Sequence, residues 1–483
     1  MIKQIASLPI VVLLNALVLG QSASSPQPQV LAITHVAVID VTSRDPRRSL
    51  NVDQTVIVSG DRISAIGRTG TLRVPAGADV IDAPTQFLIP GLWDMHIHVF
   101  GGNWPTASTL ALFLANGVTG VRDMGSDLDR VLALRREIAS GSRLGPRMVV
   151  SGPSIFGLED GRIPISAEQA RVAVRQRSRA GVDFIKLYSY LSPAAFFAAI
   201  DEARKAGLTA VGHVPYGVKA SEAARAGFQS MEHLDGTFLE GTDVEEALRA
   251  EIEVRVRDRR QEYQVPQISL DQVARYRDHF DKQELQRLSA LFVRLRTWQT
   301  PTFASPETSA HVIEAMHSSF TDYPNLRYVP PAIEESWKRT LTARFSPTQM
   351  ANFSTLISHK RAIGTAMHRA GVPLLSGTDA PGPGQVPGFS LHDELNALVQ
   401  IGLSPLEALQ TATINPARFL GRQKDLGTVE RGKLADFVML DGNPLVDIDN
   451  ARRISGVVVN GRYLGKDSLN TMLAEVEARA ERR

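Results

Sequence analysis

The sequence of 483 residues contains no cysteine, and this absence removes several kinds of chemistry at once. Without thiols there is no disulfide, no thiolate zinc site, no iron–sulfur cluster and no cysteine nucleophile. Any metal ion would therefore be held by histidine, aspartate, glutamate or a modified side chain.

An excess of charge of one sign is also missing. The chain has 53 Lys and Arg against 51 Asp and Glu, which gives a formal net charge of +2. Nucleic-acid-binding domains usually carry a clustered basic surface, so this balance gives no support for a nucleic-acid partner. The apolar fraction of 43% is ordinary and is sufficient for a large core.

Long apolar runs are confined to the first residues. A positive start, Met1-Ile-Lys3, precedes an almost wholly apolar stretch at residues 8–19, and small and polar residues follow. This is the pattern of a secretory signal peptide, and the stretch is too short for a comfortable membrane span. We expect residues 1–24 to be removed and the mature chain, without a membrane span, to be exported to the periplasm or the medium.

Short strands separated by turn residues occupy both ends of the chain. They lie in residues 25–86 and 423–466, and neither segment is large enough to bury a core alone. We therefore predict that the two segments combine into one small β-sandwich. Residues 467–483 are predicted to form a charged helix or a frayed tail.

The middle of the chain, residues 87–422, contains a repeating pattern in which a predicted helix is followed by glycine and then by an apolar strand. Glycine just past a helix end is the usual left-handed cap. Eight strands are predicted, at residues 87–99, 118–121, 147–151, 182–186, 208–211, 228–231, 299–303 and 372–375. Their alternation with helices predicts an α/β fold, a (β/α)8 TIM barrel. Insertions near residues 239–297 and 305–345 are predicted to form a lid or rim above the site.

Polar residues recur where these strands end. They are His96 and His98, Lys186, His213, His233 and Asp379. Each alone has an ordinary structural explanation, such as a hydrogen-bonded buried imidazole or a helix-capping aspartate. Together at the strand ends of a barrel, where chemistry is located in this fold, they favour a metal site.

With these motifs the chain resembles the amidohydrolase superfamily, close to its exported prolidase-like and imidazolonepropionase-like members, from about residue 30 to 465. The matching motifs are Gly91-Leu-Trp-Asp-Met-His-Ile-His98, Phe184-Ile-Lys186, Gly212-His213, Glu232-His233, Gly377-Thr-Asp379, Ala412-Thr-Ile-Asn-Pro416 and Gly427-Thr-Val-Glu-Arg-Gly-Lys-Leu-Ala-Asp436. The family fold is a TIM barrel with a small β-sandwich built from both termini.

The resemblance implies two divalent metal ions and a carbamate on Lys186. As the resemblance implies, one metal is bound by His96, His98 and Asp379. The other is bound by His213 and His233, and the Lys186 carbamate bridges the two. Zinc suits these ligands, with manganese and cobalt as alternatives. Two ions roughly 3.5–4 Å apart would lower the pKa of a shared water from about 15.7 toward 7. Asp379 would then be the catalytic general base, which accepts the proton of this water and passes it to the leaving amine.

Substrate contacts are predicted near the same strand ends. Tyr188 and Tyr190 follow Lys186 and either steady the oxyanion and the substrate or serve only in packing. Arg122 ends the second strand and either binds a substrate carboxylate or pairs with Asp123. Relatives often carry a Gly-Gly-His-Gly stretch after strand three, whereas residues 151–161 contain no histidine.

The predicted function is metal-dependent hydrolysis of C–N amide bonds in small molecules, namely dipeptides or N-acyl amino acids, with esters or lactones as lesser substrates. Tyr323, Tyr328 and Trp337 are predicted to close over an apolar group of the substrate. Two alternatives stay open. One is a single-metal cyclic-amide hydrolase or deaminase of the imidazolonepropionase type, and the other is a non-catalytic metal-containing binding protein. A homo-oligomer is compatible with the sequence.

Overall fold

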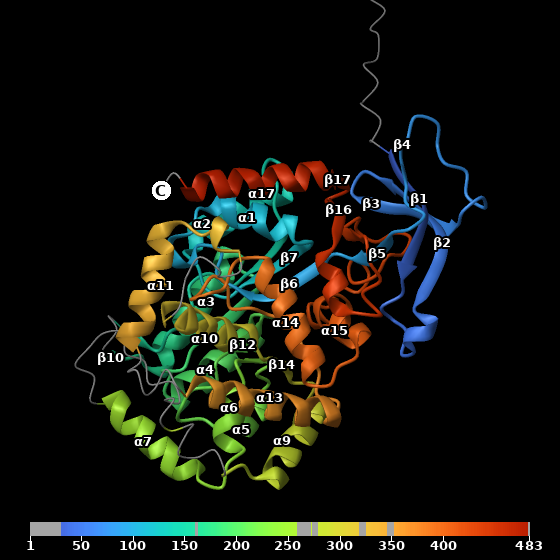
Figure 1. Ribbon diagram of the computed structural model, residues 1–483. Coiled ribbons are helices and arrows are strands. Elements are labelled where there is room, and N and C mark those ends of the chain that lie inside the picture. The colour runs from blue at the N-terminus through green and yellow to red at the C-terminus, as the bar shows by residue number, and fades with distance from the viewer. Residues whose placement is uncertain are drawn as a thin grey trace, which may run out of the picture.

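The computed structural model describes residues 30–159, 163–257, 272, 279–317, 325–344 and 352–481. The predicted signal sequence at residues 1–24 and Tyr323 lie outside these ranges. A β-sheet built near both ends of the chain lies beside a larger part in which helices surround short parallel strands (Figure 1).

The terminal sheet takes strands from both ends of the chain. Its strands are β1 (Val30–Ile39), β2 (Leu50–Ser59), β3 (Arg62–Arg68), β4 (Asp79–Asp82), β5 (Phe87–Pro90), β15 (Phe437–Leu440), β16 (Ile454–Val459) and β17 (Arg462–Gly465). Their order is β17-β16-β15-β5-β1-β2-β3, and β4 also pairs with β1. The antiparallel pairing of β15 with β5 joins the two segments, because β5 pairs on its other side with β1. Side chains from both segments, such as Ile33 and Phe437, share one apolar cluster.

The central strands form two parallel sheets with a TIM-barrel-like arrangement. One sheet has the order β6-β7-β8 and the other β11-β12-β13-β14. The strands are β6 (Leu92–Ile97), β7 (Val118–Asp123), β8 (Arg147–Val150), β11 (Phe184–Leu187), β12 (Thr209–Gly212), β13 (Ser230–Glu232) and β14 (Trp298–Thr300). Isolated parallel bridges connect their edges, from Ile155 to Leu187, from Gln299 to Leu374 and from Ile97 to Ala380. A short hairpin, β9 (Leu158–Glu159) with β10 (Ile163–Pro164), follows β8.

Two predicted strands differ from the observed ones. Residues 87–99 form two strands rather than one, because Gly91 N donates to Asp436 O in the terminal sheet whereas Leu92 N donates to Gly117 O among the central strands. The chain therefore passes from one sheet to the other at this point. The predicted eighth strand, residues 372–375, makes ladder contacts only at Leu374 and is not a regular strand.

Helices cover the outside of the central strands. They are α1 (Thr106–Ala115), α2 (Leu128–Ala139), α3 (Ala167–Ala180), α4 (Pro193–Lys205), α5 (Ala220–Arg225), α6 (Asp235–Glu240), α7 (Glu245–Arg257), α9 (Lys282–Leu295), α10 (Ala304–His317), α11 (Pro331–Arg344), α13 (Phe353–Ala370), α14 (Phe389–Gln400), α15 (Pro405–Ala412), α16 (Ile414–Phe419) and α17 (Lys466–Glu481). Short 3-10 turns are η1 (Pro46–Arg48), η2 (Gly101–Asn103), η4 (Leu326–Tyr328) and η5 (Ile448–Arg452).

Local sequence explains several helix boundaries. Ser166 and Gln169 form a capping box at the start of α3, and Gly181 ends it with φ 83°. The closing segment of the chain forms the helix α17, which lies along α1 (Figure 1). Its Val476 packs in one apolar cluster with Leu112 of α1.

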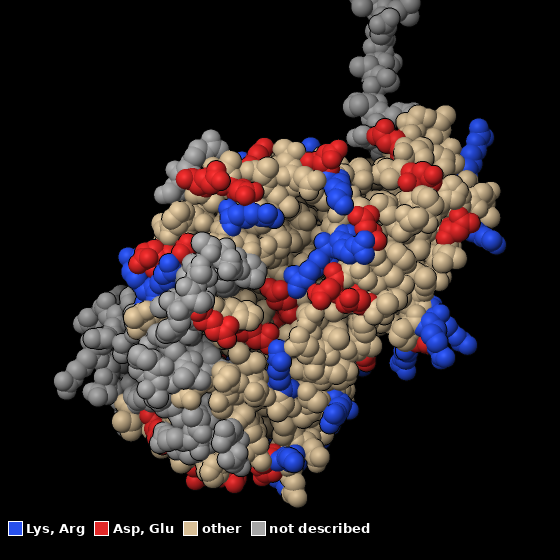
Figure 2. Space-filling model, in the orientation of Figure 1, with Lys and Arg blue, Asp and Glu red and all other residues tan. Residues whose placement is uncertain are grey.

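Buried apolar side chains extend from the central strands to the surrounding helices. The strand β6 is buried at every residue, as expected for a parallel strand covered on both faces. Basic and acidic side chains are interspersed over the face shown in Figure 2, in keeping with the small net charge. Within the described ranges, no helix combines the length and apolarity that a membrane crossing requires.

Candidate metal centre

The structure brings all six predicted metal ligands to the carboxyl ends of the central strands. His96 lies on β6 and Lys186 on β11, while His213 and His233 directly follow β12 and β13. Five of the six line a cavity of about 360 Å³, namely His98, Lys186, His213, His233 and Asp379. The sixth, His96, is fully buried beside Asp379.

Each of the four histidines is held through its Nδ1 atom by a different partner. The pairs are His96 with Glu232 Oε2 at 2.8 Å, His98 with Gly125 O at 3.2 Å, His213 with Ser189 Oγ at 2.9 Å and His233 with Thr302 Oγ1 at 2.8 Å. Such a contact fixes the orientation of a metal-ligating imidazole and leaves its Nε2 atom available. The four partners therefore present four Nε2 atoms to the strand-end site.

The distances between these atoms fit ligands that share a cation. Asp379 Oδ1 lies 3.3 Å from His96 Nε2 and 3.2 Å from His98 Nε2. The Nε2 atoms of His213 and His233 are 3.1 Å apart. Ligand atoms around a tetrahedral zinc ion with Zn–N bonds of about 2.0–2.1 Å are separated by roughly 3.3 Å.

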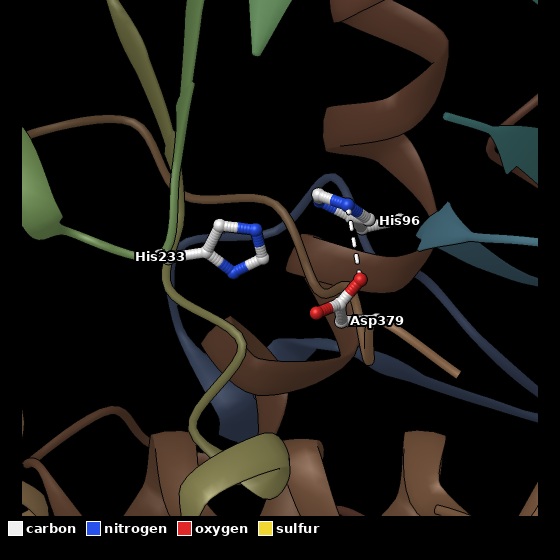
Figure 3. A group of neighbouring side chains, drawn as sticks. All are labelled: His96, His233 and Asp379. Carbon is white, nitrogen blue, oxygen red and sulfur yellow. Dashed lines mark ion pairs between the residues drawn. The ribbon is translucent and has the colours of Figure 1, made fainter. Parts of the chain in front are cut away.

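His96, His233 and Asp379 point toward one another (Figure 3), and each offers a ligand atom within 4.8 Å of the other two. The prediction assigned His96 and Asp379 to one ion and His233 to the other, yet these three side chains lie close together. The two predicted ligand sets are therefore direct neighbours in one site.

Burial sets the protonation of the histidines. Burial and the charge of Lys186 lower the pKa of His96 to about 4, and the same two causes hold the pKa of His213 well below its usual value. Burial likewise lowers the pKa of His233. For His98, burial would lower the pKa, but the hydrogen bond with Asp379 and the charges of Asp379 and Asp123 together raise it. Neutral imidazole is the form that binds metal, so burial prepares three of the four ligands.

Lys186 is a buried amine at the base of the cavity. Among the described residues its Nζ atom has no hydrogen-bond partner. Burial lowers its pKa to about 8, although the charges of Glu232 and Asp379 act in the opposite direction. A lysine with a lowered pKa has a larger fraction of neutral, nucleophilic amine near neutral pH.

The backbone is constrained around two of the predicted ligands. His233 and Asp379 have φ angles of 65° and 63°, in the left-handed region that non-glycine residues seldom occupy. Strained residues of this kind cluster at functional sites. Gly377, two residues before Asp379, approaches β6 so closely that a Cβ atom would lie 2.8 Å from His96 Cβ.

Arg122 does not lie in the cavity, and the predicted contact with a substrate carboxylate does not fit its position. Its side chain is fully buried, and Nη2 donates to Glu232 Oε1 at 2.9 Å. Its Nε donates to Met95 O. Of the two predicted roles the structure therefore favours an ion pair, with Glu232 rather than Asp123 as the partner.

Glu232 links this ion pair to the site. Both carboxylate oxygens accept from Arg122 Nη2; Oε2 also contacts His96 Nδ1, and Oε1 also accepts from Ser230 Oγ at 2.7 Å. Burial alone would raise the pKa of Glu232, but the charge of Arg122 and the His96 hydrogen bond bring it below its usual value. The sequence placed Glu232 beside His233 in a matching motif and as a fallback general base, but it did not predict the contacts of Glu232 with His96 and Arg122.

Asp94 is a residue that sequence reasoning missed. Its Oδ2 accepts from Thr378 Oγ1 at 2.7 Å, and its Oδ1 accepts from the backbone N–H groups of Thr378 and His96. Burial raises the pKa of Asp94 to about 7. Asp94 thereby ties the segment before Asp379 to β6.

The two predicted tyrosines occupy different places. Tyr188 lines the cavity and its ring lies 4.2 Å from the ring of His213. Tyr190 is buried behind it and is not among the residues that line the cavity. Phe156, from the loop that lacks the family histidine, stacks on Tyr188 at 4.7 Å.

The predicted aromatic cover is not where we expected it. Tyr328 and Trp337 are buried in an apolar cluster with Trp104 and Leu112 and do not line the cavity, although Leu341 of the same cluster does. The rest of the cavity lining, which we call the helical wall, comes instead from α6, α10, α11, α13 and the segment after Asp379. Its residues include Asp235, Phe238, Ser305, Pro306, Ser309, Leu341, Leu356, Lys360 and Gln385.

Comparison with known proteins gives one family. The model of the family described as "Amidohydrolase family" matches residues 87–464. Imidazolonepropionase of Shouchella clausii (strain KSM-K16) is 28% identical over 227 residues, which cover 42% of this chain and 48% of the relative. The chain thus spans about half the length of this curated relative.

Solved structures of similar fold cover almost the whole chain. Bottromycin amidohydrolase has a TM-score of 0.71 at 22% identity and covers 94% of this chain and 91% of its own. A putative prolidase from Bifidobacterium longum has a TM-score of 0.66 at 22% identity, with 93% and 100% covered. At these identities the likeness concerns the fold.

Proposed function

Because the chain belongs to the amidohydrolase family, we propose that it is an enzyme, a metal-dependent hydrolase of C–N amide bonds. The observation that carries the proposal is the convergence of four oriented imidazoles, an aspartate and a buried lysine at the strand ends, where all but His96 line one cavity. In this proposal the central strands are a complete (β/α)8 barrel with residues 372–375 as the eighth strand, which the bridges at Leu374 and Ala380 support. The terminal sheet is proposed to curl into a small β-sandwich around its shared core.

The donor set fits two divalent ions. His96, His98 and Asp379 would hold one ion and His213 and His233 the other, with Lys186 carrying a carbamate between them. A free ammonium at Lys186 would repel cations, whereas its carbamate is an anionic two-oxygen ligand. Its lowered pKa and its unpartnered Nζ atom support this modification. Bound zinc would act as a Lewis acid toward the amide carbonyl and lower the pKa of water toward about 7.

The chain's own residues then handle the proton and the substrate. Burial would raise the pKa of Asp379, but its neighbours His96, His233 and His98 together hold it well below its usual range. The group is therefore a carboxylate, and in this proposal it would accept the proton of the attacking water. The same proton passes to the leaving amine. Tyr188, in the cavity wall, is placed to contact the substrate.

The proposed substrates are dipeptides or N-acyl amino acids, with esters or lactones as lesser ones. A cavity of about 360 Å³ lies at the lower end of the range of about 300–1,000 Å³ for small-molecule sites. Its wall combines apolar side chains with charged ones, which suits an amide that carries both. Export of the mature protein, proposed from its first residues, would bring it into contact with such nutrients.

A second candidate is a single-metal cyclic-amide hydrolase like imidazolonepropionase. The similarity to the Shouchella clausii protein favours it. Lys186 argues against it, since a single ion needs no bridging ligand.

The direct test is hydrolysis by protein stripped of metal with a chelator and reconstituted with zinc, manganese or cobalt. The substrate panel contains dipeptides, N-acetyl amino acids and cyclic amides. We expect linear amides to be hydrolysed only by the reconstituted protein. Turnover of cyclic amides alone would establish the second candidate, and metal binding without turnover of any compound would identify a binding protein.

A further inference from the structure

The helical wall of the cavity contains a lysine that no part of the proposed chemistry uses. Lys360, on α13, is only 9% exposed and lines the same cavity as His233 and Asp379. Lys360 and His233 thus face a common space. A buried ammonium is costly unless it is paired, so its position calls for an explanation.

The pairing of Lys360 within the protein is loose. Among the described residues its one ion pair is with Asp235, at 3.6 Å between Nζ and Oδ1. Surface lysines of this chain make closer pairs, such as Lys205 with Asp201 at 2.6 Å. An ammonium has three donors, and charge-assisted hydrogen bonds are typically about 2.7–2.9 Å long. Lys360 therefore keeps donors for a ligand, and Asp235 holds the side chain in place without saturating it.

A second polar group on this wall is also unsatisfied. Gln385 is 1% exposed and lines the cavity. Among the described residues its Oε1 atom has no hydrogen-bond partner. Buried polar atoms are almost always hydrogen-bonded, so an orphan acceptor on a residue that lines a cavity points to a ligand donor such as an amide N–H.

Apolar side chains complete the wall. Phe238, Leu341 and Leu356 line the cavity with Lys360 and Gln385. The wall thus offers a cation, an acceptor and an apolar surface within one small volume. An N-acyl amino acid or a dipeptide carries the matching groups, namely a carboxylate, an amide N–H and an apolar side chain.

We propose that Lys360 binds the substrate carboxylate and that Gln385 accepts from an N–H group beside it. This inference rests on the proposed amide hydrolysis and assigns to Lys360 the role that the sequence suggested for Arg122. Asp235 is a positioning residue for Lys360. The enzyme is accordingly selective for amides with a free carboxylate.

The test compares N-acetyl-leucine with its neutral analogue N-acetyl-leucinamide on reconstituted wild-type protein, Lys360→Met and Lys360→Arg. Arg361→Met is the matched control, because it removes the next cation of α13, whose ion pair with Glu307 lies outside the cavity. Losing a hydrogen bond to a charged group typically costs about 10- to 100-fold in an equilibrium constant. We expect the ratio of kcat/KM for the acid over the amide to fall at least about tenfold in Lys360→Met, through KM, and to be largely restored in Lys360→Arg.

Calorimetric binding of N-acetyl-leucine to the same variants gives a readout that does not need turnover. Absence of hydrolysis in wild type would reject the proposed function, while at least about tenfold weaker binding to Lys360→Met would still support the carboxylate site. An unchanged ratio and unchanged affinity in Lys360→Met would overturn it, as would an equal loss in Arg361→Met. Lys360→Gln replaces Lys360→Met if circular dichroism shows that the latter is unfolded.

Discussion

The two walls of the cavity are built in different ways. The strand-end wall carries the six predicted metal ligands, and there the Nδ1 atom of each histidine has a partner at 2.8 to 3.2 Å. On the helical wall, the one ion pair that holds Lys360 among the described residues is that with Asp235, at 3.6 Å. The imidazoles of the strand-end wall are therefore fixed by close contacts before any ligand arrives, whereas the Lys360 ammonium of the helical wall is held loosely.

This difference separates chemistry from specificity. Reactive groups on strand ends keep their geometry because the parallel strands are buried and mutually bonded. Groups on the helices and loops around the strand ends can change with little effect on the strands, so the substrate can vary while the reaction stays the same. Variants of the first wall should therefore affect turnover of all substrates, and variants of the second should affect the choice among them.

The largest effect is expected for Lys186→Ala. Removing the lysine removes the proposed bridging ligand, so activity toward every amide of the panel should be lost. Short carboxylic acids such as acetate or propionate should restore part of it by taking the place of the carbamate. Steady-state rates with and without added acid measure this, with Lys205→Ala on the surface as the control. Near wild-type turnover in Lys186→Ala would remove the bridge and favour the single-metal candidate.

The next effect is expected for Asp379→Asn. Loss of general acid–base help is typically worth about 10²- to 10⁴-fold in rate, and the aspartate is also a proposed ligand. We expect kcat to fall by at least this range for acid and neutral substrates alike. A decrease of less than tenfold in protein that retains its metal would place the base on another residue.

A third variant tests the buried ion pair between Arg122 and Glu232, which holds Glu232 against His96. Removing one partner of a buried ion pair typically costs about 3–5 kcal/mol, so Arg122→Met should lower the free energy of unfolding by that amount. It should also weaken metal binding, because Glu232 would no longer be held against His96; loss of such support typically costs about 10- to 100-fold in affinity. Chemical denaturation and metal titration measure the two effects.

The half-exposed pair of Arg135 with Asp183, 2.6 Å apart, provides the control. Arg135→Met should cost about 0–1 kcal/mol and leave metal affinity unchanged. If Arg122→Met behaved like Arg135→Met, the strand-end wall would not depend on its ion pair.

The smallest effect concerns a buried histidine outside the site. His392 Nε2 donates to Asn116 O at 3.0 Å, and burial, aided by the charge of Arg452, lowers its pKa from 6.5 to about 3. The unfolded chain therefore binds a proton that the folded protein excludes, and stability present above about pH 6.5 is lost as the pH falls. Metal-free wild type should lose about 2 kcal/mol more than His392→Gln between pH 7 and 5. Equal losses in denaturant titrations at the two pH values would show that His392 is not the titrating group.

The sequence predicted the strand-end wall because its signals are local. His96 and His98 are two residues apart on one strand, and Lys186, His213, His233 and Asp379 each end an apolar run. The terminal sheet was predicted as a union of both ends, and β15 does pair with β5. The passage at Gly91 was not predicted, because an uninterrupted apolar run does not show where a chain changes partner.

The helical wall could not be predicted from such patterns. Lys360 lies in the middle of an amphipathic helix, where a lysine usually faces solvent, and only the packing of α13 over the strands turns it inward. Arg122 ends a strand just as the ligands do, yet the buried carboxylate of Glu232 lies 110 positions further along the chain and takes it as partner. Long-range pairing of this kind has no local signature.

The central claim is that the strand-end wall holds two divalent ions. The most direct measurement is elemental analysis of purified, reconstituted protein together with its specific activity. The account predicts close to two ions per chain in fully active protein and loss of activity as they are removed. One ion or none in a fully active preparation would contradict it.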